Sequence, residues 1–400
     1  MLQVRVNVRS RLFVRAWEAI GRLLASGVLA DGRLEIGRED ARNGIRPITV
    51  RRQKPIHRTL SGKPVLHLDA TLRPELARTI LPDLEVTEIA AETPHMRLRL
   101  ITGPFGKGSL CDGPHADPAE LQRRSNRRAE CVDYVRWHAR RFKRTLVIAY
   151  KDIEADFAGI PGVEAAHFNA IAGLDGYRDV GLLIVVGRPL PGTDDLGRLC
   201  AALFGHLLQG GYHKPLTGIS MRAGPVRGVR ATTHEDARAE VLRAAVCGDE
   251  LIQAIGRGRG VNRTADNPLE VHVLADVALP LVHDRLSDRD LEAPDVLQRM
   301  LLAGLAEDSP EHAARLHPEL FVSVEAAKKA FQRGGTQGHS PISDIYREMS
   351  LSSAASPRRR WPAVAARLLD RRRRRRRQGG PGARHRPAGR MAARVKPLRP

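Results

Sequence analysis

Hydrophobic residues between positions 95 and 280 form short runs, separated by longer segments with helical periodicity. The run Leu182–Val186 is apolar at every position, which is typical of a strand buried on both faces of a parallel sheet. The pattern predicts strands at Arg97–Ile101, Thr145–Tyr150, Glu164–Phe168, Leu182–Gly187 and Glu270–Leu274. Because strands that alternate with helices indicate crossover connections, the chain is predicted to be an α/β protein with a mostly parallel sheet flanked by helices.

Polar residues mark where two of the intervening helices begin. Asp117, followed by Pro118 and Glu120, predicts an N-cap with proline in the first turn. Thr232 and Glu235 form a capping-box pattern for a helix that runs towards Arg257. Outside this region, a helix is predicted at 10–30, irregular structure at 31–60, and helices with loops at 287–348.

The charge of the chain is concentrated at one end. The net charge is +21, and residues 357–400 carry 17 Lys and Arg against a single acid, Asp370, so the preceding residues are close to neutral. The segment 351–400, rich in Arg, Pro, Gly and Ala, cannot bury enough apolar surface to offset its ordering entropy and is predicted to be disordered. Two origins remain open for it: GC-rich DNA read out of frame, which we favour, or a working basic tail that binds nucleic acid.

Several classes of protein do not fit the sequence. No apolar run has the length needed to cross a bilayer, and the N-terminus lacks the pattern of a secretory signal. The cysteines are far apart and show no CxxC pair, so no metal site is expected, and free thiols in a cytoplasmic protein are predicted. They are Cys111, Cys131, Cys200 and Cys247.

The strongest chemical signal is the segment Gln253-Ala-Ile-Gly-Arg-Gly-Arg-Gly-Val-Asn-Arg263. Phosphoryl transfer develops charge on phosphate oxygens, and a guanidinium, which is permanently charged and forms paired hydrogen bonds, suits that task. The segment resembles the last motif of superfamily II helicases, Q-x-x-G-R-x-x-R. Its final position here is Gly260, so either Arg259 or Arg263 is the candidate for the second guanidinium. A solvated, basic helix end is the competing interpretation.

Three further segments resemble that family in the family's order. His67-Leu-Asp-Ala-Thr-Leu72 is similar to the motif that ends the first RecA-like domain, and Thr145–Tyr150 to the first strand of the second domain. His167–Asp175, with Gly173 and Asp175, is similar to the fifth motif. The resemblance implies a RecA-like domain. The sequence as a whole is similar to helicase-like proteins of bacterial prophages and plasmids, some of which are joined to primases.

The catalytic half of such an enzyme is not evident. Gly103-Pro-Phe-Gly-Lys-Gly-Ser109 has the wrong spacing for a phosphate-binding P-loop, and it lies after the His67–Leu72 segment, which a P-loop should precede. No acidic motif precedes residue 66. We expect five parts along the chain: an N-terminal segment (1–60), a remnant of the first RecA-like domain (61–94), the second RecA-like domain (95–286), a helical extension (287–350) and the basic tail (351–400).

The resemblance therefore implies a helicase-derived, nucleic-acid-dependent ATPase component that is inactive alone. It assigns catalytic roles to Arg257, Arg259 and Arg263, and nucleotide contacts to Gln253, Gly256, Gly173 and Asp175. ATP and Mg²⁺ are the implied cofactors, and the implied partners are nucleic acid, with DNA the expectation, and a separate chain that carries the missing domain. The alternatives are a non-catalytic nucleic-acid-binding protein that acts through its tail, and an unrelated α/β enzyme. The basic stretch 206–230 is expected to be a surface loop, either inert or in contact with the nucleic acid backbone.

Overall fold

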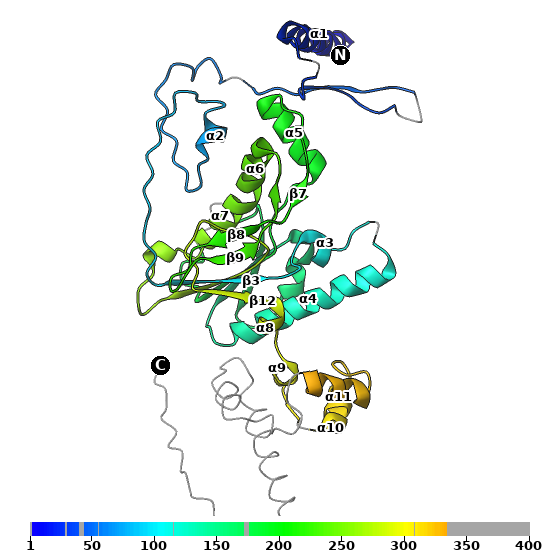
Figure 1. The fold of residues 1–400 in the computed structure, drawn as a ribbon, viewed down its shortest axis with the longest axis vertical. Helices are drawn as coiled ribbons and strands as arrows, with labels where there is room; N and C mark the ends of the chain where they lie inside the picture. The colour runs from blue at the N-terminus through cyan, green and yellow to red at the C-terminus, as the bar shows by residue number, and fades with distance from the viewer. Residues whose placement is uncertain are drawn as a thin grey trace, which may run out of the picture.

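The computed structural model describes residues 2–333, apart from 29, 40–43, 55, 115, 172–175 and 308. Gly173, Asp175 and the tail at 351–400 therefore lie outside the described residues. Within them, the prediction of an α/β fold with a parallel sheet is confirmed (Figure 1).

The core is a six-stranded sheet in the order β12-β3-β11-β6-β4-β5, and every neighbouring pair is parallel. Its strands are β3 (Met96–Thr102), β4 (Thr145–Ala149), β5 (Val163–His167), β6 (Leu182–Val186), β11 (Leu269–Leu274) and β12 (Arg285–Asp288). The five predicted strands are confirmed to within one residue at each end. The edge strand β12 was missed because it is short and partly exposed, so it lacks a continuous apolar run.

The strand β6 shows why its sequence is apolar throughout. It lies between β11 and β4, and all five of its residues are fully buried. Helices α4 (Pro118–Ala139) and α7 (Glu250–Gly256) both pack near it. Tyr134 of α4 forms a hydrogen bond with His272 of β11, whereas Gly258, just after α7, packs on Leu269 of the same strand. Side chains alternate between the two faces of a strand, so Leu269 and His272 point to opposite faces and the two helices lie on opposite sides of the sheet.

The helix preceding β11 is a composite. Helix α6 (Ala237–Ala244) continues through one π-helical turn, Ala245–Asp249, into α7, as the sequence predicted for a helix running towards Arg257. The predicted cap at Thr232 is wrong, because Asp236 accepts hydrogen bonds from the amides of Arg238 and Ala239. Thr232 and the following strand β10 (Thr233–His234) are extended instead, since β10 pairs with β7 (Tyr212–His213). The other cap, Asp117 on the amide of Glu120, is confirmed.

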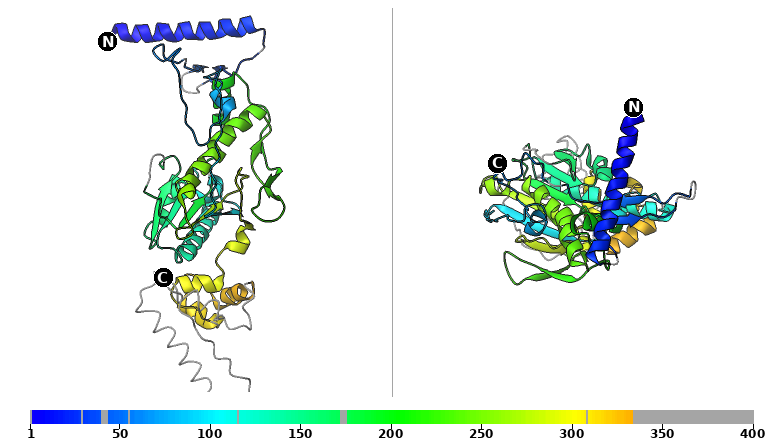
Figure 2. Two further views of the ribbon diagram at one scale, coloured as in Figure 1. Left: turned by 90° about the vertical axis from the view of Figure 1, so that its left-hand side faces the viewer. Right: turned by 90° about the horizontal axis from the view of Figure 1, so that it is seen from above.

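The remaining elements surround this core. Helix α1 (Leu2–Ser26) lies beyond the hairpin of β1 (Leu34–Ile36) and β2 (Ile48–Val50), at the end of the molecule opposite α9–α11 (Figure 2). Helix α1 is therefore longer than predicted, and the segment expected to be irregular contains a hairpin. The other short elements are α2 (Pro74–Ala77), α3 (Lys107–Leu110), the 3-10 helices Lys151–Phe157 and Gly260–Asn262, α5 (Thr193–Phe204), β8 (Leu216–Ile219) and β9 (Arg227–Arg230).

A second, smaller core lies after the sheet. Helices α9 (Val296–Leu302), α10 (Pro310–Leu316) and α11 (Val324–Arg333) bury Met300, Phe321 and Phe331 together, and α8 (Arg289–Glu292) connects them to β12. Arg299 of α9 donates to Asp133 of α4 over 3.0 Å, which attaches this unit to the main body. Of the helices in the described residues, none combines the length and apolar content that crossing a bilayer requires.

Candidate functional site

The segment that carries Thr71 packs on helix α7. The side-chain amide of Gln253 donates to the hydroxyl of Thr71 over 3.1 Å. Beside it, the guanidinium of Arg73 donates to both carboxylate oxygens of Asp249 over 2.6 and 2.7 Å. Two segments that the sequence singled out separately, around residues 67–72 and 253–263, therefore meet on one surface.

Arg257 and Arg259 follow the helix and are both partly exposed. The Nε atom of Arg257 is buried and has no hydrogen-bond partner within the described residues, so one donor of this guanidinium is unsatisfied there. Arg259 has a φ of 52°, in the left-handed region that a residue with a Cβ rarely adopts. Strain of this kind is common at functional positions.

Arg263 is held by its own loop. Its guanidinium donates to the carbonyl of Gly258 over 2.8 and 2.6 Å and to the side chain of Asn267 over 3.0 Å. The residue is 5% exposed, and burial lowers the pKa of its guanidinium. Arg263 thus fixes the turn between α7 and β11, and its donors are used within the protein.

This turn lies at the amino-terminal edge of the sheet. A Cβ at Gly258 would meet Leu269, the first residue of β11, and one at Gly260 would meet Met96, the first residue of β3. The second half of the Gln253–Arg263 segment therefore lies at the amino edge of the sheet, away from the carboxyl edge where open α/β sheets bind ligands. A crossover helix runs antiparallel to the strands it connects, so its last turn must end where the next strand begins.

The start of α7 lies closer to the carboxyl edge. Glu250 accepts a hydrogen bond of 2.9 Å from the amide of Asn169, which follows β5. His167, at the end of β5, contacts Glu154 over 2.6 Å. Gly173 and Asp175 belong to this stretch of chain but lie outside the described residues, so their role stays a prediction. Gly256 ends α7 with open space around it.

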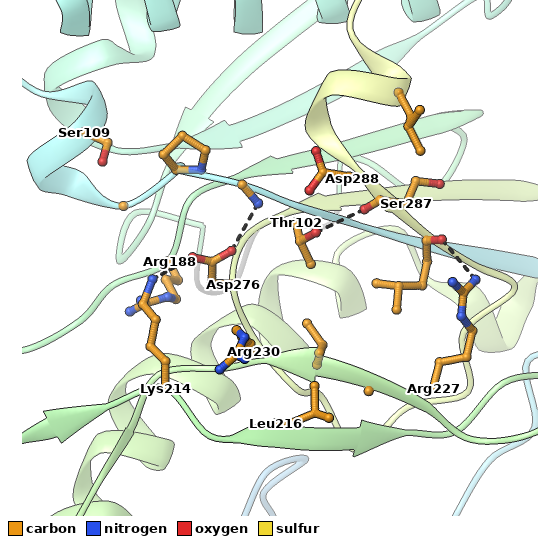
Figure 3. A pocket seen from close by; sticks show the side chains of 17 residues that line it. Thr102, Ser109, Arg188, Lys214, Leu216, Arg227, Arg230, Asp276, Ser287 and Asp288 are labelled. Carbon is orange, nitrogen blue, oxygen red and sulfur yellow. Dashed lines mark hydrogen bonds and ion pairs between the residues drawn. The ribbon is translucent and has the colours of Figure 1, made fainter.

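A cavity of about 710 Å³ lies between the carboxyl edge of β3, β11, β6 and β12 and the hairpin of β8 and β9 (Figure 3). The sequence did not identify this site. The available signal was the segment 211–234, which contains Lys214, Arg222, Arg227 and Arg230 and no Asp or Glu. The stretch expected to be a surface loop is a β-hairpin that forms one wall of the cavity.

The four cysteines are buried and form no disulfide, as predicted. Burial raises the pKa of the Cys131 thiol to about 12, so the thiol stays protonated and unreactive. No group of three His, Cys, Asp or Glu side chains in the described residues is arranged to hold a metal ion.

Comparison of the chain with protein-family models, with curated proteins and with solved structures finds no match.

Proposed function

We propose that this chain is the arginine-finger half of a nucleic-acid-dependent ATPase and that it is inactive alone. The observation that carries the proposal is the hydrogen bond between Gln253 and Thr71, across 182 residues of sequence. It joins the two motif-like segments whose types and order suggested the function.

The groups near this contact can bind the phosphates of a nucleotide. Arg257 is a permanently charged donor whose Nε lacks a partner within the described residues, and a guanidinium stabilises charge that develops on transferred phosphate oxygens. Arg263 is a poor candidate for a second guanidinium, because it donates to the carbonyl of Gly258 and the side chain of Asn267. Glu250 and Asp249 are engaged with Asn169 and Arg73, which positions the helix.

The chain supplies only part of such a site. The described residues contain no cluster of carboxylates that fits Mg²⁺, so we assign no Mg²⁺ ligand to them. In this proposal, the groups that hold the triphosphate and Mg²⁺ come from a separate chain. An arginine finger stabilises a transition state that those groups must first assemble.

The test is nucleotide binding and hydrolysis by the full chain. We expect weak binding of a fluorescent ATP analogue and no hydrolysis above the buffer rate. Binding should weaken in Arg257→Ala and persist in Arg198→Ala, a matched loss of one exposed charge on α5. Binding that is equal in both variants would refute the role of Arg257. Rapid hydrolysis by the chain alone would show that it holds a complete catalytic site.

A further inference from the structure

The floor of the cavity at the carboxyl edge is built from four neighbouring strands. Gly103 and Gly106 follow β3, Arg188 follows β6, Asp276 follows β11, and Asp288 ends β12. In open α/β sheets, ligands bind outside the carboxyl ends of the strands, because the loops that follow adjacent strands converge there. The position of the cavity is thus one that the architecture makes available for a ligand.

The opposite wall is the β8–β9 hairpin, which is fixed in place. Strand β9 places Arg227 and Arg230 along the cavity, and Lys214 precedes β8 (Figure 3). The far end of the hairpin is tied to the body by Arg222, which donates to Asp284 over 2.7 Å and to the carbonyl of Met96 over 3.1 Å. The hairpin that carries these cations is therefore held in place by its contacts with the body of the protein.

Arg188 is the most informative of these cations. It is 7% exposed, its guanidinium donates to the hydroxyl of Thr232 over 2.8 Å and also contacts the thiol of Cys247, and no carboxylate in the described part of the chain forms an ion pair with it. A buried charge without a counterion is costly, and buried charges are normally paired. An anion in the cavity would supply the missing counterion.

The acids of the cavity do not provide that counterion. Asp276 accepts from the amide of Gly103 over 3.1 Å and from Lys214 over 3.0 Å, so both of its oxygens are engaged. Asp288 accepts from the amide of Asp290 and caps α8. Arg227 donates only to the carbonyl of Leu286, and Arg230 makes no side-chain hydrogen bond among the described residues. Arg227 and Arg230 thus line the cavity without an acidic partner, and Arg188, which also lines it, directs its guanidinium to Thr232 and the thiol of Cys247.

We infer that this cavity binds phosphate groups, held by Arg188, Arg227 and Arg230. A guanidinium binds phosphate oxygens in pairs, and glycines at 103 and 106 allow a ligand to approach the backbone closely. The described lining contains no aromatic ring, so the geometry favours contacts to phosphates over stacking on bases. The phosphates can come from a nucleic acid strand or from a free nucleotide. This site is separate from the Arg257 turn at the amino edge, and it does not depend on the function proposed above.

The test uses the full chain and the double variant Arg227→Ala/Arg230→Ala, since both side chains are exposed on the hairpin. The matched control is Arg123→Ala/Arg198→Ala, which removes two exposed arginines from α4 and α5. Binding of a fluorescein-labelled oligothymidylate, of ATP and of inorganic triphosphate is measured across a range of salt concentrations, and melting curves verify folding.

If the phosphates belong to a strand, we expect about tenfold weaker oligonucleotide binding in the cavity variant and a salt slope shallower by roughly 1.4, the value for two lost phosphate contacts. If they belong to a nucleotide, ATP and triphosphate lose affinity instead. In either case, amide hydrogen exchange at 103–106 and 227–230 should slow when the probe binds to the wild-type chain. Binding of the probe to cations elsewhere in the chain would not slow exchange in these two stretches. The inference fails if the cavity variant binds every probe as the control does, or if the exchange in these two stretches does not change.

Discussion

Arg73 and Asp249 are 176 residues apart in the sequence, and the guanidinium of one holds both oxygens of the other over 2.6 and 2.7 Å. Asp249 is the last residue of the π-helical turn and is largely buried, whereas Arg73 precedes α2. This pair holds the segment around Thr71 on α7 and so positions the contact between Thr71 and Gln253.

Replacing Arg73 should destabilise the protein. Arg73→Ala leaves the buried carboxylate of Asp249 without its partner, and we expect a loss of about 2–3 kcal/mol in the free energy of unfolding. Urea unfolding measures this, with the exposed Arg78→Ala, in the same segment, as the control. In a double-mutant cycle, Asp249→Asn should recover part of the loss, because it removes the uncompensated charge. Equal stability of the Arg73 and Arg78 variants would contradict the prediction.

The backbone at Arg259 should favour glycine. Because its φ is 52°, a Cβ at this position is strained by about 1–2 kcal/mol. Arg259→Gly and Arg259→Ala both remove the guanidinium, and only the glycine variant also removes the Cβ. We therefore expect the glycine variant to melt at the higher temperature, with a difference of about 1 kcal/mol. A more stable alanine variant would show that the turn relaxes out of the left-handed region.

Gly187 connects β6 to the cavity and should not tolerate a side chain. Its φ is +85°, and a Cβ there would strike the ring of Tyr150, whose hydroxyl donates to the carbonyl of Arg188 over 2.8 Å. Gly187→Ala should cost on the order of 3 kcal/mol, because overpacking is added to backbone strain. Gly159→Ala is the matched control: its φ is +78°, but its Cβ would meet no atom within 4 Å, so only about 1 kcal/mol is expected. Similar losses would mean that the Tyr150 ring can move aside.

Stability should fall when the pH is lowered below about 6.5. Burial lowers the pKa of His138, His272 and His283 in the folded protein. Since their pKa is lower in the folded chain than in the unfolded chain, the unfolded state binds more protons in mildly acidic solution, and the stability present near neutral pH is lost. The loss should be at most about 2 kcal/mol per histidine by pH 5.

Unfolding free energies between pH 7.5 and 5 test this. The variant His138→Gln should show a shallower pH dependence than the wild type, whereas His57→Gln, which changes an exposed ring, should not. A flat profile for the wild type would mean that these rings bind protons equally in both states.

Much of the fold followed from local patterns in the sequence. The run Leu182–Val186 predicted a strand buried on both faces. This prediction needs no knowledge of distant residues, because a strand open to water on one side would alternate apolar and polar residues. The cap at Asp117 was equally readable, since its partner amide is three residues away. At Thr232 the same local rule failed, because pairing of the next residues with Tyr212–His213 competed with the cap.

The arrangement of the candidate sites was decided by the tertiary structure. The residue types in Gln253–Arg263 indicated phosphate chemistry, but the sequence did not show that Arg263 would bind Gly258 or that the turn would lie at the amino edge. Nor did it show that Arg188 would face a cavity beside Arg230. Local patterns report the surroundings of a few neighbouring residues, whereas these contacts join segments brought together by strand order and crossover connections. The sequence by itself therefore determined the five central strands and the residue types of the candidate segments, and the packing of the sheet determined which charges share a site.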